Sequence, residues 1–167
     1  RMEDRDIVAY LKVVENPADT VSLRRIINTP RRGIGDRAIS CLAMFAEQQG
    51  VSLWEACCRA QNGTVPFLNS RAENAIAAFV SLITGIQDHN AGAEHTAGVD
   101  SLPDLGELVE LVIDRSGYRA SLEGSNDPQD QARLDNLNER ESAAHEFSPD
   151  SASLRALEES FAQDNAN

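Results

Sequence analysis

The sequence is poor in aromatic side chains, in lysine and in cysteine. Aromatic residues make up 5% of the 167 residues while apolar residues make up 41%, so the core must consist mainly of Leu, Ile, Val and Ala. No apolar run approaches the roughly 18 residues that a membrane-spanning helix requires. The N-terminus also lacks the apolar stretch of a signal peptide. We therefore expect a cytoplasmic protein without a membrane partner.

The three cysteines, Cys41, Cys57 and Cys58, show no Cys-x-x-Cys spacing, and no histidine lies at ligand spacing from them. We therefore expect no metal site. The neighbours Cys57 and Cys58 cannot easily bridge each other. Two interpretations stay open: reduced thiols, some buried as small hydrophobic side chains, or an exposed thiol that links two copies of the chain on oxidation.

Motifs of self-contained enzymes are missing. The sequence has no G-x-x-x-x-G-K-[ST] phosphate loop, no H-E-x-x-H and no G-x-S-x-G. Acidic pairs such as Glu158-Glu159 are typical of a solvated helix face. We expect no catalytic residue and no bound cofactor in this chain, and an independent all-α enzyme is the weakest of the functional hypotheses.

Charge is distributed unevenly along the chain. The formal net charge of −12 argues against nucleic-acid binding by the chain as a whole. Residues 20–40 nevertheless contain five arginines and a single acid, Asp36, whereas residues 86–167 contain 18 acids and five arginines. We expect one basic patch on an acidic body, an arrangement that also permits electrostatic binding of a second copy or another protein.

Helical patterns follow one another, without the alternation and hairpin turns of strands. Apolar residues at Ile7, Tyr10, Leu11 and Val14 predict one amphipathic face. Further helices are predicted from the following boundaries: one around Leu23 to Ile27, one from an N-cap at Asp36 to Gly50, two from capping boxes at Ser52 and Ser70, one from Ser101 to near Gly117, one from Asp127-Pro128 to Ser148-Pro149, and one through Leu154 and Phe161. The fold class is therefore all-α, with about seven or eight helices.

Three other stretches lack helical periodicity. Residues 61–68 are turn-like, and residues 89–100 are small and polar and indicate a mobile surface loop. The polar tail, residues 163–167, is expected to fray.

A segment rich in arginine and glycine lies between the second and third predicted helices. Residues 28–36 read NTPRRGIGD, and two glycines flank one apolar residue, as in helix-hairpin-helix DNA-binding motifs. Glycine lets the backbone approach a phosphate closely, and the start of the following helix favours an anion. Ile34 would point inward, and Arg31, Arg32 and Arg37 would add charge. Such contacts position a duplex without reading its bases.

A plain helix-helix turn explains the same pattern. In that interpretation the glycines serve backbone geometry and the arginines lie in solvent. Asp36 also places a negative charge near the expected phosphate. Spacing alone does not separate the two interpretations.

Longer strings resemble a known family. Residues 6–19 read DIVAYLKVVENPAD and residues 21–36 read VSLRRIINTPRRGIGD, which closely resemble the start of the 2B subdomain of UvrD/PcrA/Rep-type DNA helicases. Residues 108–118 (LVELVIDRSGY) and 133–139 (RLDNLNE) resemble two later family segments. Residues 61–100 match the family only in helical character.

The resemblance implies a role and a context. Residues 1–162 would be a single accessory 2B subdomain of an ATP-dependent, 3′-to-5′ DNA helicase of DNA repair, with ATP and Mg²⁺ bound by other subdomains of the parent protein. The family's 2B subdomain swivels and restrains unwinding. By matching position, Arg32, Gly33, Ile34 and Gly35 would contact the duplex backbone weakly and without sequence specificity. Arg31 and Arg37 are added on electrostatic grounds.

One departure from the family pattern stands out. Arg140-Glu141 replace apolar residues and interrupt the stripe of Leu134, Leu137 and Ala144. Three explanations are open: a solvated face, a rotated helix or a shortened helix.

Overall fold

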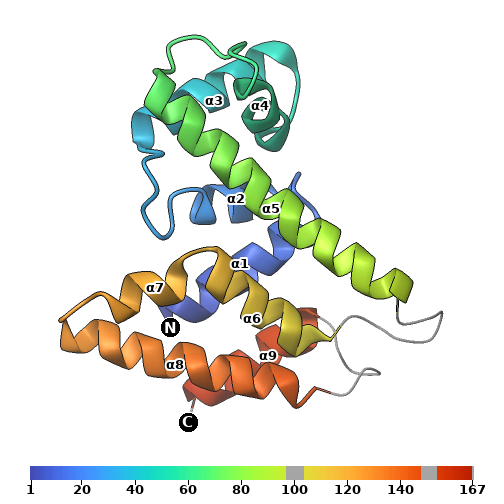
Figure 1. Cartoon of the computed structure of the whole chain (residues 1–167), viewed down its shortest axis with the longest axis vertical. Helices are drawn as coiled ribbons and strands as arrows, with labels where there is room; N and C mark the ends of the chain where they lie inside the picture. Colours follow the sequence, from blue (N-terminus) through green and yellow to red (C-terminus); the bar gives the residue numbers. More distant parts are fainter. Residues whose placement is uncertain (97–103, 148–153, 167) are drawn as a thin grey trace.

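Every regular element that the computed structural model describes is an α-helix (Figure 1). The description covers residues 1–96, 104–147 and 154–166. Within these ranges lie nine helices: α1 (Met2–Glu15), α2 (Thr20–Ile26), α3 (Asp36–Gln49), α4 (Leu53–Ala60), α5 (Ser70–Thr96), α6 (Leu105–Arg115), α7 (Tyr118–Glu123), α8 (Pro128–His145) and α9 (Leu154–Ala166). The all-α prediction is confirmed. The helix beyond the predicted eight is α7, a six-residue helix.

Helix α1 lies at the centre of the molecule and packs against α2, α5, α6, α8 and α9. The predicted apolar face is buried as expected, but Val8, Ala9 and Val13 are buried as well. A helix that is apolar on most sides is typical of a core position rather than a surface. The prediction of a single amphipathic face was therefore too narrow.

The remaining helices gather at two ends of the molecule (Figure 1). At one end α3 packs on α4, and α4 on the first part of α5; at the other, α6, α7 and α8 pack together and α9 lies beside α1. Both chain termini lie at this second end. Helix α5 extends from the first end past α1, where Gln87 donates a hydrogen bond to the Val14 carbonyl (3.0 Å). Among the helices described, none is long and apolar enough to span a membrane.

Most helix starts follow the predicted caps. Ser52 accepts a hydrogen bond from the Glu55 amide, and Pro128 stands in the first turn of α8. Two N-caps lie one residue earlier than predicted. Gly35 rather than Asp36 caps α3. Asn69 rather than Ser70 accepts from an amide of α5, because an Asn side chain reaches the same donors as a Ser side chain does.

The predicted loop at residues 89–100 was wrong over most of its length, because α5 continues to Thr96; residues 97–100 lie outside the described residues. Between Ser70 and Gly92, the part of α5 whose burial is described, the last fully buried residue is Ile86. Apolar periodicity marks only the part of a helix that covers a core, so the pattern stops before the helix does.

The tail for which fraying is predicted, residues 163–167, is helical as far as Ala166, where α9 ends. The side chains of Asp164 and Asn165 accept hydrogen bonds from the Arg140 guanidinium (2.6 and 3.2 Å). Asn167, the start predicted at Ser101 and the break predicted at Ser148-Pro149 lie outside the described residues. Within them, Asp104 caps α6 and α8 ends at His145.

A buried polar network explains the departure at Arg140. The Arg140 side chain is 4% exposed and pairs with Asp4 of α1 (2.8 Å), which is equally buried. Its guanidinium also lies 4.9 Å from the Phe161 ring centroid. Leu137 and Ala144 are fully buried on the same helix. The face is therefore packed rather than solvated, and α8 is not shortened there.

Two further acids of α1 are buried beside Asp4. Asp6 accepts hydrogen bonds from Arg25 (2.8 Å) and from the Tyr118 hydroxyl (2.7 Å). Glu3 accepts from the Asn136 amide (2.8 Å). Burial, together with the hydrogen bond to Asp6, raises the pKa of Tyr118, so its hydroxyl stays a donor. Polar contacts therefore connect α1 with α2, α7 and α8.

Candidate nucleic-acid interface

The GIG segment, which we define as residues 28–37, connects α2 to α3. Its backbone is organised by Asn28, whose Oδ1 accepts hydrogen bonds from the amides of Arg32 (2.8 Å) and Ile34 (3.3 Å). Ile34 is fully buried, in agreement with its predicted inward direction. The buried isoleucine and the Asn28 bonds hold the two glycines on either side of Ile34 in place.

The two glycines serve different purposes. Gly33 has φ +89°, a conformation that side-chain-bearing residues rarely adopt, and its Cα faces Ala75 of α5. Gly35 has φ −78°, which any residue adopts, and a Cβ built on it would meet nothing within 4 Å. Gly33 is therefore needed for the turn. The surface above Gly35 is open to an approaching group.

Arg32 differs from its neighbours in direction, because its guanidinium points into the protein. The group donates to the carbonyls of Ile26 (2.6 Å), Ile27 (3.0 Å), Thr29 (3.2 Å) and Ser116 (3.3 Å) and to the Tyr10 hydroxyl (2.6 Å). It also lies 5.0 Å from the Phe79 ring centroid. Its side chain therefore holds the segment in shape, so the predicted phosphate contact does not fit its geometry.

The exposed charges of the segment are Arg31 and Arg37, with Asp36 between them. No side chain caps α3, so the amides of its first turn have no intrahelical or side-chain acceptor. These amides lie beside Gly35 and its open surface. The segment thus combines unpaired backbone donors with two exposed arginines, as anion binding requires, and with one opposing carboxylate.

The five arginines of residues 20–40 do not form one surface. Arg25 pairs with Asp6 (2.8 Å). Arg24 and Arg25 line a groove of about 1030 Å³ between α1, α2 and α9, together with Arg1 and Lys12. The predicted single basic patch was therefore wrong in its extent.

Arg71 is a neighbour of the GIG segment that the sequence analysis missed. It is exposed in the first turn of α5, four residues before Ala75, whose Cβ would lie 3.9 Å from a Cβ placed on Gly33. Residues four apart lie on the same helix face, so Arg71 belongs to the side that faces the segment. Some 35 residues of chain separate Arg71 from Gly35, and no local signal in the sequence connects them.

The cysteines have unequal environments. Cys57 is fully buried, and burial raises its pKa to about 12. Cys58 and Cys41 are half-buried. Burial also raises the pKa of Cys58, and the Glu55 carboxylate adds to this. A cross-link to a second copy, which remains a prediction, is therefore limited to Cys41 and Cys58.

We expect alkylation by iodoacetamide at pH 8 to modify Cys57 at least about tenfold more slowly than Cys41, because only the accessible thiolate reacts. Mass spectrometry of a time course measures the three rates separately. Urea-unfolded chain is the control, in which all three rates should converge. Equal rates in the folded chain would contradict the burial of Cys57.

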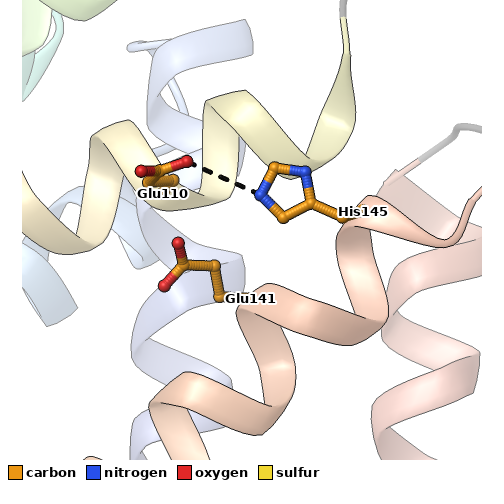
Figure 2. A group of neighbouring side chains, drawn as sticks. All are labelled: Glu110, Glu141 and His145. Atoms are coloured by element: carbon orange, nitrogen blue, oxygen red, sulfur yellow. Dashed lines mark ion pairs between the residues drawn. The ribbon is translucent and has the colours of Figure 1, made fainter.

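A separate group of ligand-type side chains lies between α6 and α8. Figure 2 shows Glu110 of α6 and Glu141 and His145 of α8 pointing toward one another, with an ion pair between His145 Nε2 and a Glu110 oxygen (3.5 Å). One ligand atom from each residue lies within 4.8 Å of the others. This group was not predicted, because Glu110 stands 31 residues before Glu141 and no local spacing connects them.

The chain was compared with known proteins. The family described as "UvrD-like helicase C-terminal domain" matches residues 1–149. The chain is 55% identical over 157 residues to the ATP-dependent DNA helicase UvrD1 of Mycobacterium tuberculosis (94% of this chain, 19% of that protein). It is 31% identical over 147 residues to the ATP-dependent DNA helicase PcrA of Bacillus subtilis (88% and 18%), and 31% identical over 148 residues to DNA helicase II of Escherichia coli (89% and 19%). The chain thus spans about a fifth of the length of these relatives.

Proposed function

Since the chain belongs to the UvrD-like helicase family, we propose that it is the accessory 2B subdomain of a larger ATP-dependent DNA helicase and contacts duplex DNA through the GIG segment. The observation that supports the contact most directly is the uncapped start of α3 beside Gly35, whose surface is open. ATP and Mg²⁺ would be bound by other parts of the helicase, and the subdomain would act by docking on the duplex and restraining unwinding as it swivels.

Phosphate is the ligand that this surface fits. Amides in the first turn of a helix point outward, and the helix dipole favours an anion there. Arg31 and Arg37 are exposed and stand on either side of Gly35 in the sequence, and Arg71 is exposed in the first turn of α5. Backbone amides and arginine side chains bind phosphate without reading base edges, so the contact we propose is to the DNA backbone and independent of sequence.

The acidic body limits the affinity. With a net charge of −12, the chain repels a polyanion at long range. Nonspecific contacts at physiological salt usually give Kd values of about 10⁻⁴ to 10⁻⁶ M, and we expect this chain to lie at the weak end. In the parent helicase, other DNA contacts would raise the effective concentration of the duplex near the GIG segment.

Replacing both Arg31 and Arg37 with alanine should weaken duplex binding about tenfold at low salt, because two charge-assisted phosphate contacts are lost. The slope of log K against log salt should fall by about 2. Fluorescence anisotropy of a labelled duplex at several salt concentrations measures both quantities. Arg32 is left unchanged, because its side chain supports the fold.

Two further variants test whether the loss of binding is local to the GIG segment. The Arg133→Ala/Arg155→Ala variant loses the same charge from α8 and α9 and should keep the wild-type salt slope. Gly35→Ala places a methyl group on the open surface, where it meets no atom of the chain, so it should weaken binding without lowering stability. Equal losses in the GIG and control double variants would contradict a local contact.

A second candidate function is a binding surface for another protein or for a second copy of the chain, and failure to bind DNA even at low salt would favour it. Sedimentation velocity would then decide between its two forms. A dimer lost on adding reductant would indicate Cys41 or Cys58, whereas a dimer lost on adding salt would indicate charge pairing.

A further inference from the structure

The cluster of Glu110, Glu141 and His145 lies apart from the GIG segment, on the packed pair of α6 and α8 (Figure 2). Glu141 and His145 are four residues apart on α8, so their side chains leave the same helix face one turn apart. Glu110 approaches from α6 and reaches within 3.5 Å of His145 Nε2. Two helices therefore contribute one imidazole and two carboxylates to one point.

Gly106 fixes the direction of the His145 ring. A Cβ at Gly106 would lie 2.2 Å from His145 Nδ1 and 2.7 Å from the His145 Cα, so only glycine lets α8 approach α6 at this point. With the Nδ1 edge of the ring against α6, Nε2 faces Glu110. The imidazole thus presents one defined nitrogen to the centre of the cluster.

The guanidinium of Arg119 is a cation that competes with a metal ion for the Glu141 carboxylate. Arg119 donates hydrogen bonds to Asp114, Asn138 and Oε2 of Glu141. A carboxylate has two oxygens, each with two acceptor sites, so Glu141 retains acceptor capacity while bonded to Arg119. The guanidinium nevertheless repels a nearby cation, and its removal should therefore tighten metal binding.

We propose that Glu110, Glu141 and His145 form a site for a divalent transition metal of the Zn²⁺ type. Imidazole nitrogen selects Zn²⁺, Ni²⁺ or Cu²⁺ over Mg²⁺ and Ca²⁺, which prefer oxygen ligands alone. Ligands of a tetrahedral Zn²⁺ lie about 3.4 Å from one another when each bond is about 2.1 Å. The ligand atoms here lie within 4.8 Å, so modest rotations of these partly exposed side chains complete the geometry.

Three protein ligands leave at least one coordination position of the metal ion for water. The site is therefore open, unlike a structural zinc site with four protein ligands. Because its ligands come from α6 and α8, a bound ion connects these helices directly. An ion that binds only the folded chain also raises its stability in proportion to the logarithm of the ion concentration. Metal occupancy would thus stiffen the end of the molecule where both termini lie.

Titration of the tag-free chain with ZnCl₂ at pH 7.5, followed by calorimetry, tests the site. A Cys41→Ser/Cys58→Ser background removes accessible thiols that also bind Zn²⁺. We expect one ion per chain, with affinity reduced at least about tenfold in His145→Ala and in Glu110→Gln. Arg119→Gln should bind more tightly, and a chemical-shift change at the His145 ring nitrogens should accompany saturation.

His89→Ala is the matched control, because His89 is an exposed histidine on α5 outside the cluster. Its affinity should equal that of the parent chain, and circular dichroism should show that every variant is folded. Unchanged Zn²⁺ affinity in His145→Ala would overturn the proposal. So would the lack of any saturable binding by the parent chain and by Arg119→Gln.

Discussion

Replacing Arg32 with alanine is expected to lower the free energy of unfolding by about 3 kcal/mol, since hydrogen bonds from a charged donor contribute about 1.5–3 kcal/mol. The substitution removes the guanidinium donor from the Ile27 carbonyl and one of two donors from the Ile26 carbonyl, which keeps the Thr29 amide. It also removes the contact by which the Arg32 side chain reaches the Ser116 carbonyl. Urea denaturation followed by circular dichroism measures the loss.

Arg31→Ala is the matched control, because the neighbouring arginine is exposed and its loss should change stability by no more than about 0.5 kcal/mol. Arg32→Lys keeps the positive charge but changes the shape of the donor group. A lysine ammonium lacks the planar fork of donors with which a guanidinium reaches several carbonyls at once, so this variant should recover only part of the stability. Similar stabilities for Arg31→Ala and Arg32→Ala would contradict the inward direction of Arg32.

The second large effect concerns the buried pair of Asp4 and Arg140. Arg140→Met should destabilise the fold by about 3 kcal/mol or more, because removing one partner leaves the other charge buried without compensation. The double variant Asp4→Leu/Arg140→Met should lose much less than the sum of its two single variants. Urea denaturation of all four proteins gives the coupling energy, and strict additivity would contradict the pairing.

The same pair predicts how stability depends on pH. Burial alone would raise the pKa of Asp4, but hydrogen bonds from Arg140, Asn165 and Asn136 outweigh burial and hold that pKa below its ordinary value. A carboxyl whose pKa is lowered by folding stabilises the protein fully above its unfolded pKa, near 4, and loses this contribution as the pH falls through the lower folded pKa. Between pH 4 and pH 2, Asp4→Asn should therefore lose less stability than the wild-type chain.

Apolar periodicity and capping residues predicted eight of the described helices, because both signals are local. The same signals missed α7, which has six residues and buries only Tyr118 and Leu122. They also placed the end of α5 too early, because a helix that leaves the core no longer needs an apolar face. Local patterns thus describe how a helix packs rather than how far it extends.

The candidate site was predicted only in part, because some of the contacts that orient its side chains come from residues far away in the sequence. Arg31 and Arg32 are adjacent and chemically identical, and the acceptors that hold only Arg32 include the Tyr10 hydroxyl, 22 residues earlier, and the Ser116 carbonyl, 84 residues later. Likewise, the sequence does not indicate which acidic side chains are buried. The partner of Asp4, Arg140, stands 136 residues further along the chain. Charged side chains in a sequence give no sign of which ones are paired inside the fold.

The anchoring of Arg32 also has a mechanical consequence. Through this one side chain the GIG segment is fastened to Tyr10 of α1, to the Phe79 ring of α5 and to the Ser116 carbonyl at the end of α6. These three contacts oppose bending of the segment relative to the helices. A force applied to the segment is therefore passed on to α1, α5 and α6 through the Arg32 side chain.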